Sequence, residues 1–282
     1  VSRLGIALAA KLGLGFAASE IWPEQAADIM LTGVFASAGL DQKVVETSKG
    51  PVHYLTGGEG QTVIFLHGIF ALKEHWIDMS RELSGNYRVI LLDLPGFGEN
   101  PRLDPSEYDY QSQAENVIEA LDQIGVNEFH IAANSMGSQI AGMLAKAYPK
   151  RVKSLAFIGS PSGVTSPERS DMEKALISGQ TPLVVTNADE YAKRMAWLFP
   201  EEPFIPRPMA RAWSIKEVSN ADINPKIWNA VRASTTAPLE EIAPELKQPT
   251  LLVWCKQDRV FHVSGAAVLD KALPDNKLIT PE

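Results

Sequence analysis

A serine between small residues is the strongest candidate for chemistry in this sequence. Ser135 stands in the pentapeptide Ala-Asn-Ser-Met-Gly, after an apolar run at 129–134 and before a helix-like pattern at 136–149. A sharp strand-to-helix turn of this kind raises a serine hydroxyl above a sheet, and small flanking residues let strand and helix approach each other. Gly137 meets that requirement, and Ala133 exceeds the usual glycine by one methyl group. The pattern predicts a nucleophilic serine, with a serine that only caps a helix as the alternative.

A serine nucleophile needs donors for the negative charge that develops on a substrate oxygen, and we expect two backbone N–H groups to supply them. The first belongs to Met136, directly after the serine. The second belongs to Ile69, in the loop that follows the apolar run at 62–66. His67 begins this loop beside a glycine, and we interpret it as a structural residue that holds the loop through its ring nitrogens.

The expected acid of a catalytic triad is Asp258. It follows the apolar run at 250–255, and the end of a late strand is where a carboxylate that orients a histidine is expected. The alternative is a solvated loop carboxylate. Asp93, in Asp-Leu-Pro-Gly-Phe-Gly, competes for the role, but the neighbouring proline and glycines indicate a turn.

No histidine is well placed as the base that takes the serine proton. The expected chain order is serine, acid, histidine, and only His262 follows Asp258. It lies four residues later, where both side chains are expected to share one loop. Apart from His67, the other histidines all precede the acid. They are His53, His75 and His130.

Short apolar runs are expected to form the sheet that positions these residues. Runs of four to eight residues without alternation are typical of parallel strands that are buried on both faces. They occur at 62–68, 88–96, 129–137, 153–160 and 250–255, with a last run at 277–280. Helical patterns separate them at 71–84, 112–125 and 136–149, and two short strands joined by a Gly-Pro turn precede them. This alternation predicts an α/β fold with a mostly parallel, doubly wound sheet.

The alternation breaks between about residues 160 and 249, where helix-like segments and prolines dominate. We expect a helical cap, or lid, at 161–248 over the carboxyl ends of the strands, and a core made of 44–160 and 249–282. The lid carries bulky apolar residues that can line an acyl-chain pocket, although such residues more commonly form lid core. They are Met195, Trp197, Leu198, Phe199, Phe204, Ile205, Met209 and Trp213.

The N-terminal segment 1–43 is expected to be a helical segment that resembles an anchor or signal, and its residues 1–22 are expected to tether or target the protein. Arg3 precedes an apolar stretch at 4–18 that Lys11 interrupts, which fits a membrane anchor, a signal sequence or a helix that is soluble or interfacial. A membrane-associated or exported, periplasmic-side location is expected, with the cytoplasm as the alternative. The sequence leaves the oligomeric state open.

Composition excludes several classes of partner and cofactor. The 282 residues carry a net charge of −8, which disfavours nucleic-acid binding. A single cysteine excludes an internal disulfide and a multi-cysteine metal site. Neither a metalloprotease pattern nor a nucleotide-binding glycine motif is present, so no metal and no cofactor is expected.

The chain resembles α/β-hydrolases of the bacterial lipase and esterase group, and also membrane-anchored monoacylglycerol lipases. The matching stretches are VHYLTGG, VIFLHGIFALKEHW, VILLDLPGFGEN, HIAANSMGSQIAGMLAKAYPKRVKSLAFIGS and PTLLVWCKQDRVFHVSGA, which cover nearly all of 44–282. The resemblance implies a serine hydrolase that cleaves carboxylic esters through an acyl-enzyme. It also implies a catalytic histidine beyond Glu282, so a chain that ended there is expected to have little hydrolase activity.

Other activities of the same fold remain as alternatives. A serine nucleophile argues against haloalkane dehalogenases and epoxide hydrolases, which attack through a carboxylate. Carbon–carbon bond hydrolases and cofactor-free perhydrolases use the same triad as esterases. A non-catalytic binding protein is the alternative outside enzymes, and it would apply if the natural chain ended at Glu282.

Overall fold

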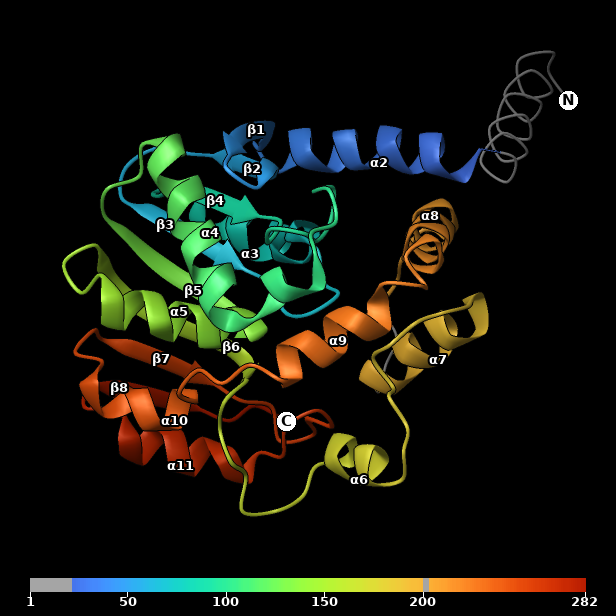
Figure 1. Cartoon of the computed structure of the whole chain (residues 1–282). Coiled ribbons are helices and arrows are strands. Elements are labelled where there is room, and N and C mark those ends of the chain that lie inside the picture. Colours follow the sequence, from blue (N-terminus) through green and yellow to red (C-terminus); the bar gives the residue numbers. More distant parts are fainter. Residues whose placement is uncertain (1–21, 200–202) are drawn as a thin grey trace, which may run out of the picture.

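The short apolar runs form a sheet at the predicted positions. The computed structural model describes residues 22–199 and 203–282, and within them the eight strands have the order β1-β2-β4-β3-β5-β6-β7-β8 (Figure 1). β2 is antiparallel to β1 and β4, and the other neighbours are parallel. The strands are β1 (Asp41–Thr47), β2 (Gly50–Gly57), β3 (Thr62–Leu66), β4 (Arg88–Leu92), β5 (Phe129–Ser135), β6 (Val152–Pro161), β7 (Thr250–Val253) and β8 (Asn276–Ile279). The predicted mostly parallel α/β sheet is confirmed.

Helices cover both faces of this sheet. Those of the sheet core are α2 (Pro23–Ser37), α3 (Ile77–Leu83), α4 (Tyr110–Ile124), α5 (Met136–Ala147) and α11 (Ser264–Ala272), with short 3₁₀ turns η1 (Lys73–Trp76) and η2 (Pro105–Tyr108). α4 shows how local sequence sets the bounds. The Asp109 carboxylate accepts hydrogen bonds from the N–H groups of Gln111 and Ser112, and Gly125 ends the helix in a left-handed conformation.

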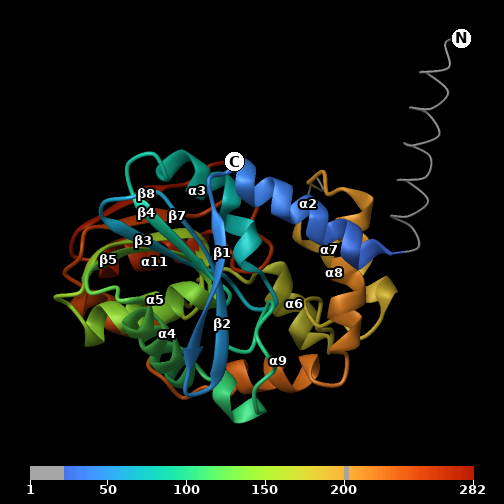
Figure 2. The same ribbon diagram turned by 90° about the horizontal axis from the view of Figure 1, so that it is seen from above.

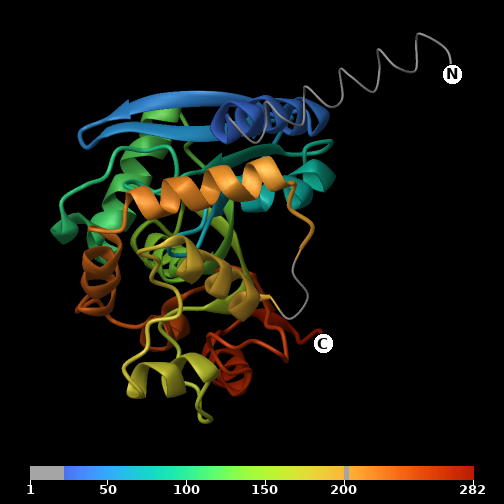
Figure 3. The ribbon, with the colours of Figure 1, turned by 90° about the vertical axis from the view of Figure 1, so that its right-hand side faces the viewer.

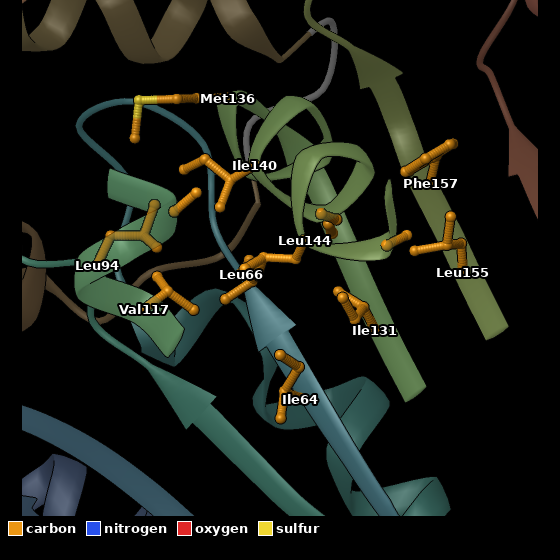
Figure 4. Close-up of a cluster of buried hydrophobic side chains, with 14 of the residues drawn as sticks. Ile64, Leu66, Leu94, Val117, Ile131, Met136, Ile140, Leu144, Leu155 and Phe157 are labelled. Carbon is orange, nitrogen blue, oxygen red and sulfur yellow. The ribbon is translucent and has the colours of Figure 1, made fainter. Parts of the chain in front are cut away.

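The two faces of the sheet belong to two apolar clusters because side chains alternate along each strand. Ile64 and Leu66 of β3 pack with Ile140 and Leu144 of α5 on one face, where Figure 4 shows these side chains together. Phe65, between them in sequence, packs on the other face in the cluster that includes Trp76 and Phe35. β3 is buried at all five positions, as a continuous apolar run requires.

One predicted helix is divided into two elements. The helix expected at 71–84 is the 3₁₀ turn η1 followed by α3. Lys73 and Trp76 are both buried, and residues three apart lie on one side of a 3₁₀ turn. The tighter turn therefore directs both side chains into the protein.

The lid lies between β6 and β7. Its described residues form α6 (Asp171–Ile177), α7 (Ala188–Leu198), α8 (Arg207–Ser219), α9 (Asn224–Arg232), α10 (Leu239–Ile242) and the 3₁₀ turn η3 (Ala243–Glu245), and no strand occurs among them. Figure 3 shows the lid helices, coloured yellow to orange, facing the viewer.

Helix α2 joins the sheet to the lid. Near its end Phe35 packs in the sheet cluster, and near its start Ala27 packs against Met209 and Ala212 of α8. Figure 2 shows α2 extending from the β1–β2 hairpin toward α7 and α8. The apolar stretch at 4–18 lies outside the described residues, and no helix among 22–199 and 203–282 is both long and apolar enough to span a bilayer. The first strand begins at Asp41, slightly before the expected core boundary at residue 44.

Candidate active site

The backbone at Ser135 adopts a conformation that L-residues rarely take. Ser135 ends β5 and immediately precedes α5, with φ 49° and ψ −117°. Within the described chain it is one of two non-glycine residues with positive φ, and Phe70 is the other. Such a conformation persists only where the surrounding structure holds it, and it commonly marks a functional site. The predicted sharp strand-to-helix turn is therefore present.

Two glycines allow the chain to pack closely around Ser135. A Cβ atom at position 137 would lie 2.4 Å from the carbonyl oxygen of Leu66. A Cβ atom at position 68 would lie 3.1 Å from Cβ of Ser135 and 3.6 Å from its Oγ. The loop that follows β3 thus lies directly against the serine hydroxyl. The N–H of Ser162 donates to the carbonyl oxygen of Ser135 and links the start of the lid segment to this turn.

His67 holds the loop after β3, as the sequence predicts. Its Nδ1 donates to the carbonyl oxygen of Gly68 at 2.7 Å, and its Nε2 accepts from the N–H of Leu94 at 2.9 Å. These partners assign the proton to Nδ1. The side chain is buried, and burial lowers the pKa of the imidazole because the charged ring would lose its hydration.

Asp93 has the turn role that its neighbours indicate. Its Oδ1 accepts from the N–H of Lys73 at 3.0 Å, and its Oδ2 accepts from Nζ of Lys73 at 2.8 Å and from the N–H of Glu99 at 3.0 Å. The carboxylate is fully buried. Since these three donors come from the two loops beside it, Asp93 connects loops.

Asp258 lies in the loop after β7, where the sequence places it. Its Oδ1 accepts from the N–H groups of Val260 at 2.8 Å and Phe261 at 3.0 Å. Nε1 of Trp254 donates to the carbonyl oxygen of Phe261 and further fixes this loop. Oδ2 of Asp258 makes no hydrogen bond within the described chain, so the carboxylate retains an acceptor for another group.

No histidine of the described residues makes a hydrogen bond to Ser135. His262 instead accepts at Nδ1 from the N–H of Ser264 at 3.3 Å, and its Nε2 lies 4.0 Å from Oε2 of Glu168. His75 faces Trp213 of α8 with ring centroids 6.5 Å apart. His53 of β2 contacts Glu99, and His130 of β5 contacts Ser154.

An apolar cluster joins the lid to the loop after β3 and to the loop that carries Asp258. Its buried members are lid residues, namely Met172, Leu183, Val184 and Trp228. Packed against them are Ile69 and Phe70 from the loop after β3, Val260 from the Asp258 loop, and Trp197 and Leu198 of α7. Arg259 also donates to the carbonyl oxygen of Trp197 at 3.0 Å and lies over its ring. The lid is therefore fixed to the two loops that carry the candidate oxyanion donor and the candidate acid.

A groove of about 460 Å³ lies between α7 and α8. Each helix contributes residues spaced by three and four positions, which form one stripe on its surface. The lining residues are Ala188, Tyr191, Ala192 and Met195 from α7, Arg207, Ala210, Arg211 and Ser214 from α8, and Pro203 and Ile205 between them. Of the apolar lid residues expected to line a pocket, Met195 and Ile205 do so. Met209 and Trp213 instead pack in the cluster shared with α2, and Phe204 is exposed.

The sequence analysis predicts no role for two residues of this region, Asn134 and Lys73. Asn134 donates from Nδ2 to the carbonyl oxygen of Ile158 at 2.9 Å and so links β5 to β6 beside the serine. Lys73 is completely buried among carboxylates. Its burial depends on partners far along the chain, so no local pattern marks it. Within the described ranges no group of three or more potential metal-ligating side chains occurs.

Comparison with known proteins decides the family. A family model described as the alpha/beta hydrolase fold matches residues 61–282. The chain belongs to the α/β-hydrolase family. The resemblance inferred from the sequence is confirmed, and Ser135 stands in this α/β-hydrolase at the turn between β5 and α5.

Named relatives of this α/β-hydrolase include lipases. Lipase 1 of Psychrobacter immobilis is 25% identical over 224 residues, covering 79% of this chain and 70% of that protein. A monoacylglycerol lipase of Xenopus laevis is 28% identical over 226 residues, covering 77% and 67%. The solved structure of a bacterial membrane phospholipase A is 31% identical with a TM-score of 0.89, covering 100% of this chain and 91% of that one. A meta-cleavage product hydrolase from Pseudomonas fluorescens, at 21% identity and a TM-score of 0.68 over 85% and 88%, shares the fold.

We expect the His67 ring to remain neutral, with its proton on Nδ1, at a pH of about 6.5, where a solvated histidine is half protonated. Because the pKa is lowered in the folded state, its contribution to stability is present above that pH and is lost as the pH falls toward the folded pKa. Nitrogen-15 NMR of the ring during an acid titration measures this, with the urea-denatured protein as control. A ring that is half protonated at the same pH in both samples contradicts the assignment.

Proposed function

We propose that this protein is a serine hydrolase that cleaves carboxylic esters through an acyl-enzyme. The observation that carries the proposal is the strained turn at Ser135, with the loop after β3 packed against the serine hydroxyl. The proposal assigns the oxyanion donors to the backbone N–H groups of Met136, directly after the serine, and of Ile69, in the loop packed against it. The lipases and monoacylglycerol lipase among the relatives support an ester substrate.

In the proposed mechanism, Oγ of Ser135 attacks the carbonyl carbon of the ester. The carbonyl oxygen becomes negative, and the N–H groups of Met136 and Ile69 stabilise it. A histidine oriented by Asp258 takes the serine proton and gives it to the departing alcohol. Water then attacks the acyl-enzyme and the same base takes its proton. The base gives this proton to Oγ of Ser135 as the bond between Oγ and the acyl carbon breaks, and the carboxylic acid leaves. None of the histidines described in the structure hydrogen-bonds to Ser135. The proposal therefore names a histidine as the base without giving it a residue number.

The proposed substrate is a lipid ester with an apolar acyl chain, such as a monoacylglycerol. The groove between α7 and α8 is the proposed acyl-chain site. Its volume of about 460 Å³ is that of a small-molecule pocket, and Met195, Ile205 and three alanines supply apolar walls. α7 also packs through Trp197 and Leu198 against the cluster that includes Ile69. The helix that lines the groove therefore also contacts the proposed oxyanion loop.

The proposal assigns a different role to each segment of the chain. Residues 44–160 and 249–282 form the catalytic core, residues 161–248 form the cap, and residues 1–43 associate the protein with a membrane. A membrane phospholipase A among the similar solved structures supports the last point. α2, which follows this segment, packs on both the sheet and α8.

Ser135→Ala is expected to lower kcat for a p-nitrophenyl ester about 10⁶-fold in the full-length protein, because the nucleophile of a triad is lost. The variant is also expected to lose labelling by a fluorophosphonate probe. Ser178→Ala, at an exposed lid position, is the matched control and is expected to label like the parent. Equal labelling of the parent and Ser135→Ala would remove Ser135 from the mechanism.

Ala192→Phe is expected to shorten the preferred acyl chain. The added ring fills part of the groove, and each buried methylene of a substrate is worth about 0.8 kcal/mol, so losing two lowers kcat/KM about tenfold. The measurement is kcat/KM for dodecanoyl and butanoyl esters, and kcat/KM is expected to fall only for the longer ester. Ala267→Phe, at an exposed position of α11, is the control. A uniform change for both esters argues against the groove as the acyl site.

Removal of residues 1–22 is expected to move the protein from the membrane fraction to the soluble fraction of expressing cells. Because α2 begins at Pro23, the deletion leaves its contacts with the sheet and α8 intact. Fractionation followed by immunoblotting measures the distribution, and thermal melting of the shortened protein verifies its fold. The same distribution for both forms would show that this segment is no tether.

A further inference from the structure

A fully buried lysine lies at the end of the loop that carries the proposed oxyanion donor. The Lys73 side chain is 0% exposed, and its Nζ lies 2.8 Å from Oδ2 of Asp93, 2.8 Å from Oε2 of Glu99 and 2.9 Å from Oε1 of Glu74. Removing an ammonium group from water costs several kcal/mol, which ion pairs offset only when their geometry is good. An apolar side chain at this position would fill the space without that cost. The cluster therefore calls for a role beyond packing.

The loop between His67 and Lys73 is attached at both ends to the segment that follows β4. At its start, Nε2 of His67 accepts from the N–H of Leu94. At its end, both the N–H and Nζ of Lys73 donate to Asp93. Phe70 lies between these anchors with φ 56°, a conformation that a non-glycine residue avoids. The anchors thus hold a strained loop in place.

The segment that receives Lys73 is itself tightly held. Asp93 is fully buried, and a Cβ atom at Gly98 would lie 2.1 Å from its Cγ, so the carboxylate lies against the backbone of the following turn. Nδ2 of Asn100 donates to the carbonyl oxygens of Asp93 and Leu94. The N–H of Glu99 donates to Asp93, and the carboxylate of Glu99 accepts from Nε2 of Gln42. Lys73 therefore binds a preorganised acceptor rather than a mobile one.

We propose that Lys73 is a positioning residue for ester hydrolysis, whose ion pair with Asp93 holds the loop after β3 so that the N–H of Ile69 points at the oxyanion. This inference rests on the proposed function. A hydrogen-bond donor to the oxyanion acts on the transition state and hardly on the bound ester. Loss of the Lys73 anchor therefore lowers kcat and leaves KM nearly unchanged. A purely structural lysine would alter stability without this separation.

The test compares Lys73→Met with the parent in the full-length protein. We expect kcat for a p-nitrophenyl ester to fall about 100-fold, the loss typical of one oxyanion donor, with KM within about threefold. The affinity for a trifluoromethyl ketone, which forms an oxyanion on Ser135, is expected to fall by the same factor as kcat. Lys153→Met is the matched control, because its ion pair with Glu128 is exposed. Thermal melting verifies the fold of each variant.

The outcomes separate this inference from the proposed function. A folded Lys73→Met variant with kcat within about threefold of the parent overturns the role of Lys73, as does a loss that appears only in KM. If Lys73→Met does not fold, Glu99→Gln decides, because Oε2 of Glu99 lies 2.8 Å from Nζ of Lys73 and helps to hold the ammonium group against Asp93, while its half-exposed side chain can be replaced without opening the core. Its kcat is expected to fall about fivefold at constant KM, and an unchanged kcat overturns the role. A parent protein that hydrolyses no ester contradicts the proposed function itself.

Discussion

The strained backbone at Ser135 is the constraint on which the rest of the site depends. A non-glycine residue in such a conformation costs about 1–3 kcal/mol, so the surrounding structure must hold it. β5 supplies one side of that support, since it is paired with β3 as far as Ala133 and with β6 as far as Ser135. α5 supplies the other through Ile140 and Leu144, which are buried in the main apolar cluster. Sheet and helix are both anchored in the core, and the turn between them has little freedom to relax.

Buried polar groups extend this constraint to the neighbouring loops. Burial alone would raise the pKa of the Asp93 carboxyl, but the adjacent Lys73 ammonium lowers it below the usual range, so the pair stays ionised. His67 is kept neutral by the same burial, which lets it donate at one nitrogen and accept at the other. These groups join the segments after β3 and β4 in directions that apolar contacts do not specify. The geometry of the loop after β3 therefore depends on buried polar groups at its two ends, His67 and Lys73.

Local sequence predicts the features that depend on local physics. The apolar runs at 62–66 and 88–92 become buried parallel strands, and the small residues around Ser135 permit the turn that they predict. The division of the helix at 71–84 is not predicted, because the buried position of Lys73 in η1 depends on partners that are distant in the sequence. That burial requires Asp93 and Glu99, which are 20 and 26 residues away in sequence. The packing of α2 on α8 is similarly non-local, since Ala27 meets Met209 from a distant part of the chain.

Helix α2 connects the sheet and the lid through contacts near its two ends. Toward the sheet, Phe35 and Leu40 from α2 and the segment after it are buried in a cluster with Phe65. Toward the lid, Ala27 is buried with Met209 of α8, and partly buried apolar side chains of both helices pack around them. Hydrophobic stabilisation is roughly proportional to the apolar area removed from water, so both attachments stabilise the position of α8 relative to the sheet. A displacement of α8 from the sheet would have to expose apolar surface at one of these two contacts, and α2 therefore opposes it.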